Sequence, residues 1–198
     1  MNTDCVSLVL IGLRGSGKTT VGRRLADLLD RPLVDLDQVT PGLLGCTSIG
    51  QAWSEHGEPA FRGAERDALA SVLPLPGRVI ALGGGTPTAP GAADLLRAAH
   101  RSGSIRTVYL RARPETLRAR LAGQNQAHRP SLTGRGVLDE VQAVFEARDA
   151  LYQALADDVI NTDAMCEADV VAYLRALART SAHGGSASDD SVRDDSTG

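Results

Sequence analysis

The sequence is poor in cysteine and in excess charge, and it contains no long hydrophobic run. Its three cysteines are odd in number and widely spaced, so the spacing suggests neither a disulfide framework nor a metal knuckle and fits a reducing cytosol. The net charge of −3 argues against nucleic acid or an anionic membrane as a partner, because either would require a basic excess. The apolar stretch at residues 6–13 is too short to span a bilayer and follows no cationic leader. We expect a cytoplasmic monomer whose partners are small molecules.

Lysine is nearly absent. Among 21 lysines and arginines, only residue 18 is lysine. Drift in base composition replaces lysine by arginine wherever a generic cation suffices, so the position that keeps lysine is informative. A compact ammonium on a flexible stem fits against phosphate oxygens inside a tight loop, where a planar guanidinium would not. Lys18 is therefore a candidate phosphate ligand.

The sequence alternates between strand patterns and helix patterns. Apolar runs bounded by turn residues predict buried strands at residues 6–12, 31–37, 78–82, 105–110 and 158–161. Apolar residues at helical spacing predict helices at 18–29, 58–73, 92–99, 114–121 and 138–155, and a last helix that follows the fifth strand and ends at about 178. This alternation indicates an α/β fold with a parallel sheet, and the length favours one domain.

Three segments depart from this alternation. Prolines and glycines in residues 38–57 predict an irregular, mobile flap in which any helix is short or broken. The polar segment 123–136 suits a lid that closes over a ligand, although an ordinary solvated loop has the same composition. Residues 180–198 are small, polar and acidic, which predicts a disordered tail after a single domain at 1–179.

The motif GLRGSGKT at residues 12–19 matches the phosphate-binding P-loop at each fixed position, between a predicted strand and a predicted helix. Its backbone N–H groups and the helix N-terminus favour a bound phosphate. In this reading Lys18 bridges the β- and γ-phosphates of ATP, and the Thr19 hydroxyl binds Mg²⁺. The residues expected to contact ATP are Gly15, Ser16, Gly17, Lys18, Thr19 and Thr20. A glycine-rich turn without a ligand is the alternative.

Two acids end the second predicted strand. Asp35 and Asp37 lie at the carboxyl end of that strand, the edge where open α/β sheets bind ligands, and strand alternation would point them the same way. One could hold a water of the Mg²⁺ shell, and the other could accept or orient the proton of an acceptor hydroxyl. Solvated acids at a strand end, or a helix N-cap by Asp37, are the alternatives.

Glycines and arginines supply further candidates. Gly83, Gly84 and Gly85 follow the third strand and permit close approach of a ligand to the backbone, although a tight turn explains them as well. Arg62 lies three residues before Glu65, on the same helical face, and could grip a carboxylate. Arg129 in the lid is a candidate for the phosphoryl charge and Arg148 for the acceptor. Any one of these arginines could instead be a solvated surface charge.

Taken together, these segments resemble the shikimate kinases. The points of contact are GLRGSGKTT, LVDLD, the run from Trp53 to Glu65 (W-x-x-x-G-E-x-x-F-R-x-x-E), VIALGGG, the RP of the lid, and EARDALY at 146–152. In order and spacing they cover nearly all of residues 6–178. The run from Trp53 to Glu65, followed by a strand and three glycines, is the most specific of them.

The resemblance implies a P-loop NTPase fold of the nucleoside monophosphate kinase type, with three α/β/α layers, a five-stranded parallel sheet of order 2-3-1-4-5 and a lid. It implies that the ligands are ATP, Mg²⁺ and shikimate, and that the reaction belongs to aromatic amino-acid biosynthesis. It also implies an acceptor-binding segment at about 37–66. Asp37 would be the base, Asp35 would lie near Mg²⁺, Arg129 would reach the phosphates and Arg120 would flank adenine. The shikimate contacts would be Asp37, Arg62, Gly83, Gly84, Gly85 and Arg148.

Two other functions fit the same P-loop. One is a kinase of another small hydroxy acid or polyol, similar to the gluconate kinases, which share the P-loop and the sheet. The other is a nucleotide-binding module without enzymatic activity, whose acceptor pocket has degenerated. Phosphorylation assays on shikimate and gluconate would separate these functions.

Overall fold

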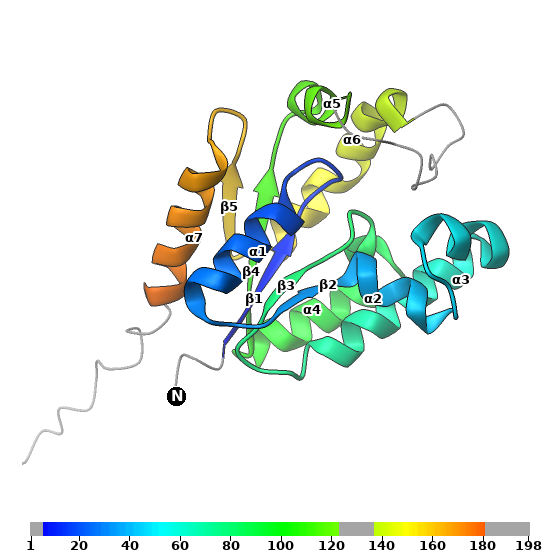
Figure 1. The fold of residues 1–198 in the computed structure, drawn as a ribbon, viewed down its shortest axis with the longest axis horizontal. Coiled ribbons are helices and arrows are strands. Elements are labelled where there is room, and N and C mark those ends of the chain that lie inside the picture. Colours follow the sequence, from blue (N-terminus) through cyan, green and yellow to red (C-terminus); the bar gives the residue numbers. More distant parts are fainter. Residues whose placement is uncertain (1–5, 123–136, 181–198) are drawn as a thin grey trace, which may run out of the picture.

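A computed structural model of the chain describes residues 6–122 and 137–180. Its centre is a five-stranded sheet of order β2-β3-β1-β4-β5 in which all neighbouring strands are parallel (Figure 1). The strands are β1 (Ser7–Ile11), β2 (Leu33–Asp35), β3 (Val79–Ala81), β4 (Ile105–Arg111) and β5 (Asp158–Asn161). The predicted α/β class, the five strands and their order are confirmed.

Helices connect successive strands and cover both faces of the sheet. They are α1 (Lys18–Leu29), α2 (Leu36–Leu43), α3 (Ile49–Val72), α4 (Ala92–Arg101), α5 (Pro114–Ala122), α6 (Val137–Leu155) and α7 (Glu167–Thr180), with the short 3₁₀ helix η2 (Thr86–Thr88) after β3. Parallel strands require such crossover connections. Among the described residues, no helix combines the length and hydrophobicity that crossing a bilayer demands.

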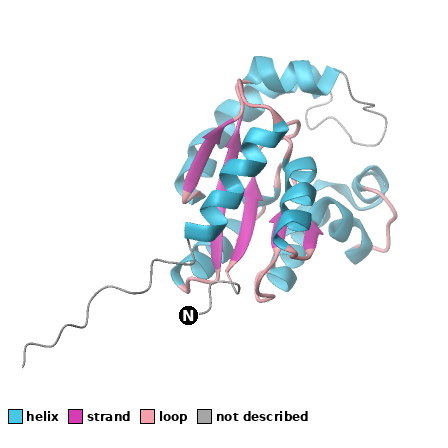
Figure 2. Ribbon diagram, turned by 60° about the vertical axis from the view of Figure 1, so that its left-hand side comes forward, coloured by secondary structure: helices cyan, strands magenta, loops and turns pink. Residues whose placement is uncertain are grey.

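Two hydrophobic cores lie on opposite faces of the sheet, because successive side chains of a strand point in opposite directions. In β1, Leu8 and Leu10 join the core beneath α1 and α7, whereas Val9 and Ile11 join the core beneath α3, α4 and α6. All four side chains are buried. In Figure 2 helices lie in front of the strands and behind them. The sheet is thus covered on both faces.

The segment at residues 38–57 is more regular than its prolines and glycines suggested. Helix α2 covers eight residues and includes Pro41, and the first part of α3 begins after Ser48, whose side chain accepts a hydrogen bond from the Gln51 N–H. A kink at Gly57, with φ of 75°, separates that part from the helix expected at 58–73. The prediction of short or broken helices is confirmed, but the expected irregular flap is wrong, because side-chain caps stabilise both short helices. The predicted lid (123–136) and tail (180–198) lie outside the described residues, except for Thr180, which ends α7.

Candidate active site

Three strands deliver their carboxyl ends to the same edge of the sheet. Strand β1 leads into the glycine-rich loop before α1, β2 ends at Asp35, and β3 leads to the glycines at 83–85. Because β2, β3 and β1 are adjacent and parallel, these three turns are neighbours in space. The candidate residues of the sequence therefore meet where open α/β sheets bind ligands.

The loop after β1 folds around the ammonium of Lys18. Its Nζ donates hydrogen bonds to the carbonyl oxygens of Gly12, at 2.8 Å, and Leu13, at 3.0 Å, and lies 3.4 Å from the Ser16 hydroxyl. Lys18 is only 8% exposed. Gly15 and Gly17 have φ of 84° and 94°, a left-handed backbone that favours glycine over other residues. This loop therefore holds a buried cation against its own backbone.

The N-terminus of α1 is suited to an anion. Its N-cap residue, Gly17, offers no side chain to the first N–H groups, and the first turn contains no acid. These donors and the helix dipole favour a negatively charged ligand. A cleft follows the loop and continues to Arg120, which donates to the carbonyl oxygen of Thr162 at 2.6 Å and to its hydroxyl at 3.1 Å. The predicted ATP residues that line this cleft are Gly15, Ser16, Gly17, Lys18, Thr19, Thr20 and Arg120.

Thr19 and Asp35 form a pair of oxygen ligands beside this cleft. The Thr19 hydroxyl donates to Asp35 Oδ2 at 2.8 Å, while Asp35 Oδ1 accepts from the backbone N–H of Asp37 at 3.0 Å. Hydroxyl and carboxylate oxygens are the protein ligands that Mg²⁺ prefers, so this pair fits a magnesium site. Asp35 is also the N-cap of α2 and ends β2, and Asp37 lies in the first turn of α2. The expectation that both acids belong to the second strand is therefore wrong for Asp37, and the N-cap of the following helix is Asp35, not Asp37.

A second pocket lies on the other side of the glycines and is centred on Arg62. The Arg62 guanidinium donates to Glu65 at 2.6 Å and to Glu58 at 3.3 Å, and it stacks over the Trp53 ring with its central carbon 5.3 Å from the centroid. Its side chain is 12% exposed. Burial raises the pKa of Glu65, and the neighbouring guanidinium opposes that shift. Arg62 is thus oriented toward the pocket by an acid that is itself almost fully buried.

The three glycines fit closely among the groups of this pocket. A Cβ atom at Gly83 would lie 2.7 Å from Asp37 Oδ1 and 2.8 Å from the Thr86 hydroxyl, and one at Gly85 would overlap the Arg62 guanidinium. A Cβ at Gly84 would lie 3.0 Å from the Arg14 backbone nitrogen. Any larger residue would therefore displace the side chains that line the site. The triplet also forms a turn, in which the Thr86 N–H donates to the carbonyl oxygen of Gly83 at 3.1 Å.

Helix α6 lies beside the pocket, which Arg148 lines, and Tyr152 is buried one turn further along the helix. Both side chains donate to the carbonyl oxygen of Gly84, at 2.9 and 2.8 Å. The helix is tied to β4 by Asp149, which accepts two hydrogen bonds from Arg111, at 2.8 and 2.9 Å, and one from the Tyr109 hydroxyl at 2.8 Å. The hydrogen bond from Arg111 holds the pKa of Asp149 below its usual value. The position of Arg148 therefore depends on a polar network on the sheet side of α6.

The two pockets meet at Arg14, Asp37 and Gly84, which line both. The sequence analysis missed Arg14, because it occupies a variable position of the loop motif, and it assigned no role to Thr86, whose hydroxyl donates to Glu65 at 2.8 Å. Arg129 lies outside the described residues. The predicted residues that line the second pocket are Asp37, Arg62, Gly84, Gly85 and Arg148, while Gly83 lies directly behind Asp37.

Comparisons with known proteins agree with this arrangement. The family model described as shikimate kinase matches residues 14–178. The shikimate kinase of Rhodopirellula baltica is 44% identical over 170 residues, covering 82% of this chain and 86% of that protein. The structure of a shikimate kinase from Acinetobacter baumannii in complex with shikimate superposes with a TM-score of 0.78 at 28% identity, covering 89% of this chain and 94% of that one.

A gluconokinase from Sinorhizobium meliloti 1021 shares the fold at lower similarity. Its TM-score is 0.58 at 19% identity, over 92% of this chain and 95% of that one. A likeness at this identity shows a common architecture only. The family model extends across the loop at 14–19, the pocket around Arg62 and the α6 residues. This chain belongs to the shikimate kinase family.

Proposed function

We propose that this protein is a shikimate kinase, which transfers the γ-phosphoryl group of ATP to a hydroxyl of shikimate and forms shikimate 3-phosphate. The observation that carries the proposal is the junction of the two pockets at Arg14, Asp37 and Gly84. A triphosphate in the first pocket would present its terminal group to a hydroxyl held in the second. In-line transfer needs this placement more than it needs covalent chemistry from the protein.

On the nucleotide side, the loop N–H groups and Lys18 bind the phosphates. Lys18 Nζ has its present acceptors in the Gly12 and Leu13 carbonyls and can reach a phosphate oxygen by rotating its stem. Thr19 and Asp35 would hold Mg²⁺, directly and through water. Magnesium, when bound, supplies positive charge to the phosphate oxygens. Arg120 would flank the adenine at the far end of the cleft.

On the acceptor side, Arg62 and Arg148 would bind the shikimate carboxylate as two guanidinium donors. Asp37 would accept the proton of the attacking hydroxyl as its oxygen bonds to the γ-phosphorus, while the bond from that phosphorus to the bridging oxygen breaks and ADP leaves. Gly83, Gly84 and Gly85 leave room for the ring. Arg129, in the proposed lid at 123–136, would stabilise the charge on the transferred group.

We also propose that the enzyme acts as a monomer in the cytoplasm and has no nucleic-acid partner. The net charge of −3 supports the absence of a nucleic-acid partner, because a polyanion needs a basic surface. Light scattering of the purified chain would test the monomer, with a concentration-independent mass near 20.7 kDa as the expected result.

The test of function is ADP release measured with shikimate, with gluconate and without acceptor. We expect turnover with shikimate that exceeds the other two by orders of magnitude, and we expect Asp37→Asn to lower it while nucleotide binding persists. Preference for gluconate would establish the other kinase activity. Normal binding of MgATP without turnover on either acceptor would indicate a degenerate module and overturn the proposal.

A further inference from the structure

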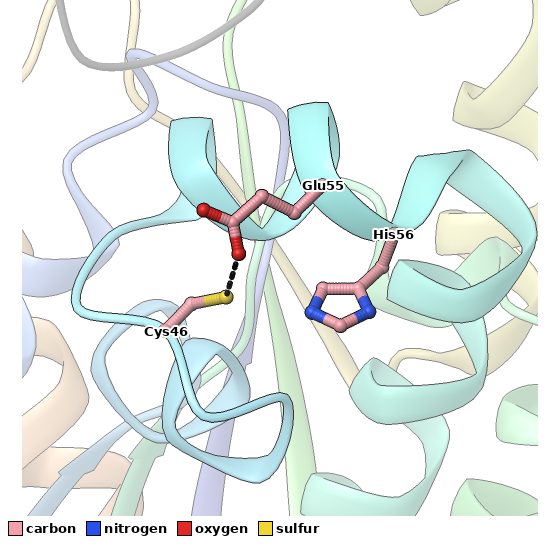
Figure 3. Close-up of side chains that lie close together, drawn as sticks. All are labelled: Cys46, Glu55 and His56. Carbon is pink, nitrogen blue, oxygen red and sulfur yellow. Dashed lines mark hydrogen bonds between the residues drawn. The ribbon is translucent and has the colours of Figure 1, made fainter.

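Three metal-ligating side chains converge outside the proposed active site, in the segment that joins α2 to the kinked part of α3. Cys46 lies in the connection between these helices, while Glu55 and His56 lie in α3 just before the Gly57 kink. One ligand atom from each side chain lies within 4.8 Å of the other two. Figure 3 shows the thiol, the carboxylate and the imidazole facing a common space from these two segments.

We propose that Cys46, Glu55 and His56 form a binding site for a thiophilic divalent cation, with Zn²⁺ as the best match. A thiolate and an imidazole favour Zn²⁺ over Mg²⁺ or Ca²⁺, which prefer oxygen ligands. Tetrahedral zinc with bonds of about 2.0–2.3 Å keeps its ligand atoms roughly 3.5 Å apart. The Cys46 sulfur lies 3.8 Å from Glu55 Oε2, close to that spacing. Water would complete the coordination, because Glu55 and His56 are exposed.

Neighbouring side chains already orient the carboxylate. Gln51 donates from Nε2 to Glu55 Oε1 at 3.0 Å, and its own Oε1 accepts hydrogen bonds from the Thr47 N–H and hydroxyl at 2.9 and 3.1 Å. The other carboxylate oxygen, Oε2, is the one that faces Cys46. Hydrogen-bonded carboxylates of this kind are typical of metal sites, where the outer partner fixes the ligand. The cluster is therefore partly preorganised.

A cation here would connect two parts of the acceptor-binding segment. Cys46 packs in a small core with Ala52 and Phe61, against which Trp53 lies, and both aromatic side chains line the pocket around Arg62. Coordination would fasten the connection before α3 to the helical turn that follows Trp53. The site is distinct from the Thr19–Asp35 pair, whose oxygen ligands suit a harder ion. Cys46, Glu55 and His56 have no spacing typical of metal ligands, so sequence reasoning did not identify them.

Cobalt titration of the untagged, chelator-treated protein tests the site, because a Co²⁺–thiolate bond produces a charge-transfer band in the near ultraviolet. We expect a saturable band that Zn²⁺ abolishes at one equivalent. Cys46→Ser should remove the band, and Glu55→Gln and His56→Asn should each weaken binding by at least about 10- to 100-fold, the range that loss of an outer partner alone can cost. Gln51→Leu should weaken it by about 10-fold.

Matched controls exist elsewhere in the chain. Cys166→Ser, Cys5→Ser and His100→Asn should leave cobalt affinity unchanged, and circular dichroism should show that each variant keeps its helices. A band that survives in Cys46→Ser, or the absence of a band with millimolar Co²⁺, would overturn the proposal. Kinase activity does not enter these measurements, so they stand apart from the test of function.

Discussion

Arg62 and Glu65, one helical turn apart in α3, are joined by a contact of 2.6 Å between Nη1 and a carboxylate oxygen of an almost fully buried acid. A charge-assisted pair of this kind fixes the direction of the guanidinium as well as its charge. Arg62 Nε and Nη2 donate to the exposed Glu58 at 3.3 Å, so an acceptor carboxylate would replace that longer contact while Glu65 keeps the guanidinium in place.

Substitution Arg62→Ala should raise the KM for shikimate by about 10- to 100-fold, because hydrogen bonds to a charged group contribute about 1.5–3 kcal/mol. The KM for ATP should change little. Arg66→Ala is the control, since Arg66 lies one turn further along α3 and pairs with Asp67 on the surface. Initial-rate kinetics with each substrate varied in turn would check this. Equal effects of the two variants would contradict the role of Arg62.

Substitution Gly83→Ala should lower kcat by about 100-fold, because the new Cβ would displace the Asp37 carboxylate, and misplacement by about 1 Å can have that effect. Gly63→Ala provides the contrast: no atom outside its own helix and chain neighbours lies within 4 Å of a Cβ there. That variant should keep its activity and gain about 0.5–1 kcal/mol of stability, because alanine favours the helix. Loss of activity in both would point to a general packing defect.

Substitution Lys18→Ala should lower kcat by about 10²- to 10³-fold, the scale for one donor to transition-state charge. Lys18→Arg should not restore activity, because the planar guanidinium does not fit between the Gly12 and Leu13 carbonyls. Arg23→Ala, on the exposed face of α1, should behave as wild type. Near-full turnover in Lys18→Ala would refute the assignment.

Substitution Asp149→Asn should reduce the free energy of unfolding by about 1.5–3 kcal/mol at pH 7, because Arg111 loses a charged acceptor. The pKa of Asp149 is lowered in the folded state, so the stabilisation is full above the usual value of 3.8 and is lost as the pH falls through the lower, folded pKa. Urea titrations at pH 7, 5 and 3.5 should show the wild-type advantage shrinking only at the lowest pH. A constant difference at all three would exclude this linkage.

Trp53 is the only tryptophan, and it lies in the pocket wall beneath the Arg62 guanidinium. Its fluorescence should change when shikimate binds, because the acceptor alters the contact between ring and cation. ATP alone should have a smaller effect, since Trp53 does not line the nucleotide cleft. A titration in which saturating shikimate leaves the emission unchanged would place the acceptor elsewhere.

Local patterns were sufficient to predict the strands, their parallel arrangement and the phosphate loop, whereas the strand order followed from the family resemblance. The apolar run of β1 and the glycines around Lys18 each carry their signal within a few residues, so their positions could be read directly. The helices at 36–43 and 49–56 were harder to predict from the sequence. Pro41 and Gly57 indicate helix breaks, whereas the N-cap side chains of Asp35 and Ser48 stabilise a short helix on each side.

The remaining features depend on tertiary proximity. Arg14 lines both pockets because β1 and β3 are adjacent, and no sequence motif predicts this position of its side chain. Likewise Asp149 acquires its partners Arg111 and Tyr109 only once α6 packs on β4. The contacts of Asp149 join residues 38 and 40 positions apart and leave no periodic pattern.

Because Lys18 is the only lysine and is buried within its loop, chemical modification of its amine can report on the state of that loop. With no other lysine, the only primary amines are the α-amino group and a side chain that is 8% exposed and bonded to backbone carbonyls. An acylating reagent can therefore modify only one lysine side chain. Because the ε-amine is buried, the extent of its acylation measures how often the loop opens. Mass spectrometry would give the acylated fraction of Lys18 with and without nucleotide. The difference between the two fractions would report how much of the protein has nucleotide bound, and no reporter group would need to be introduced.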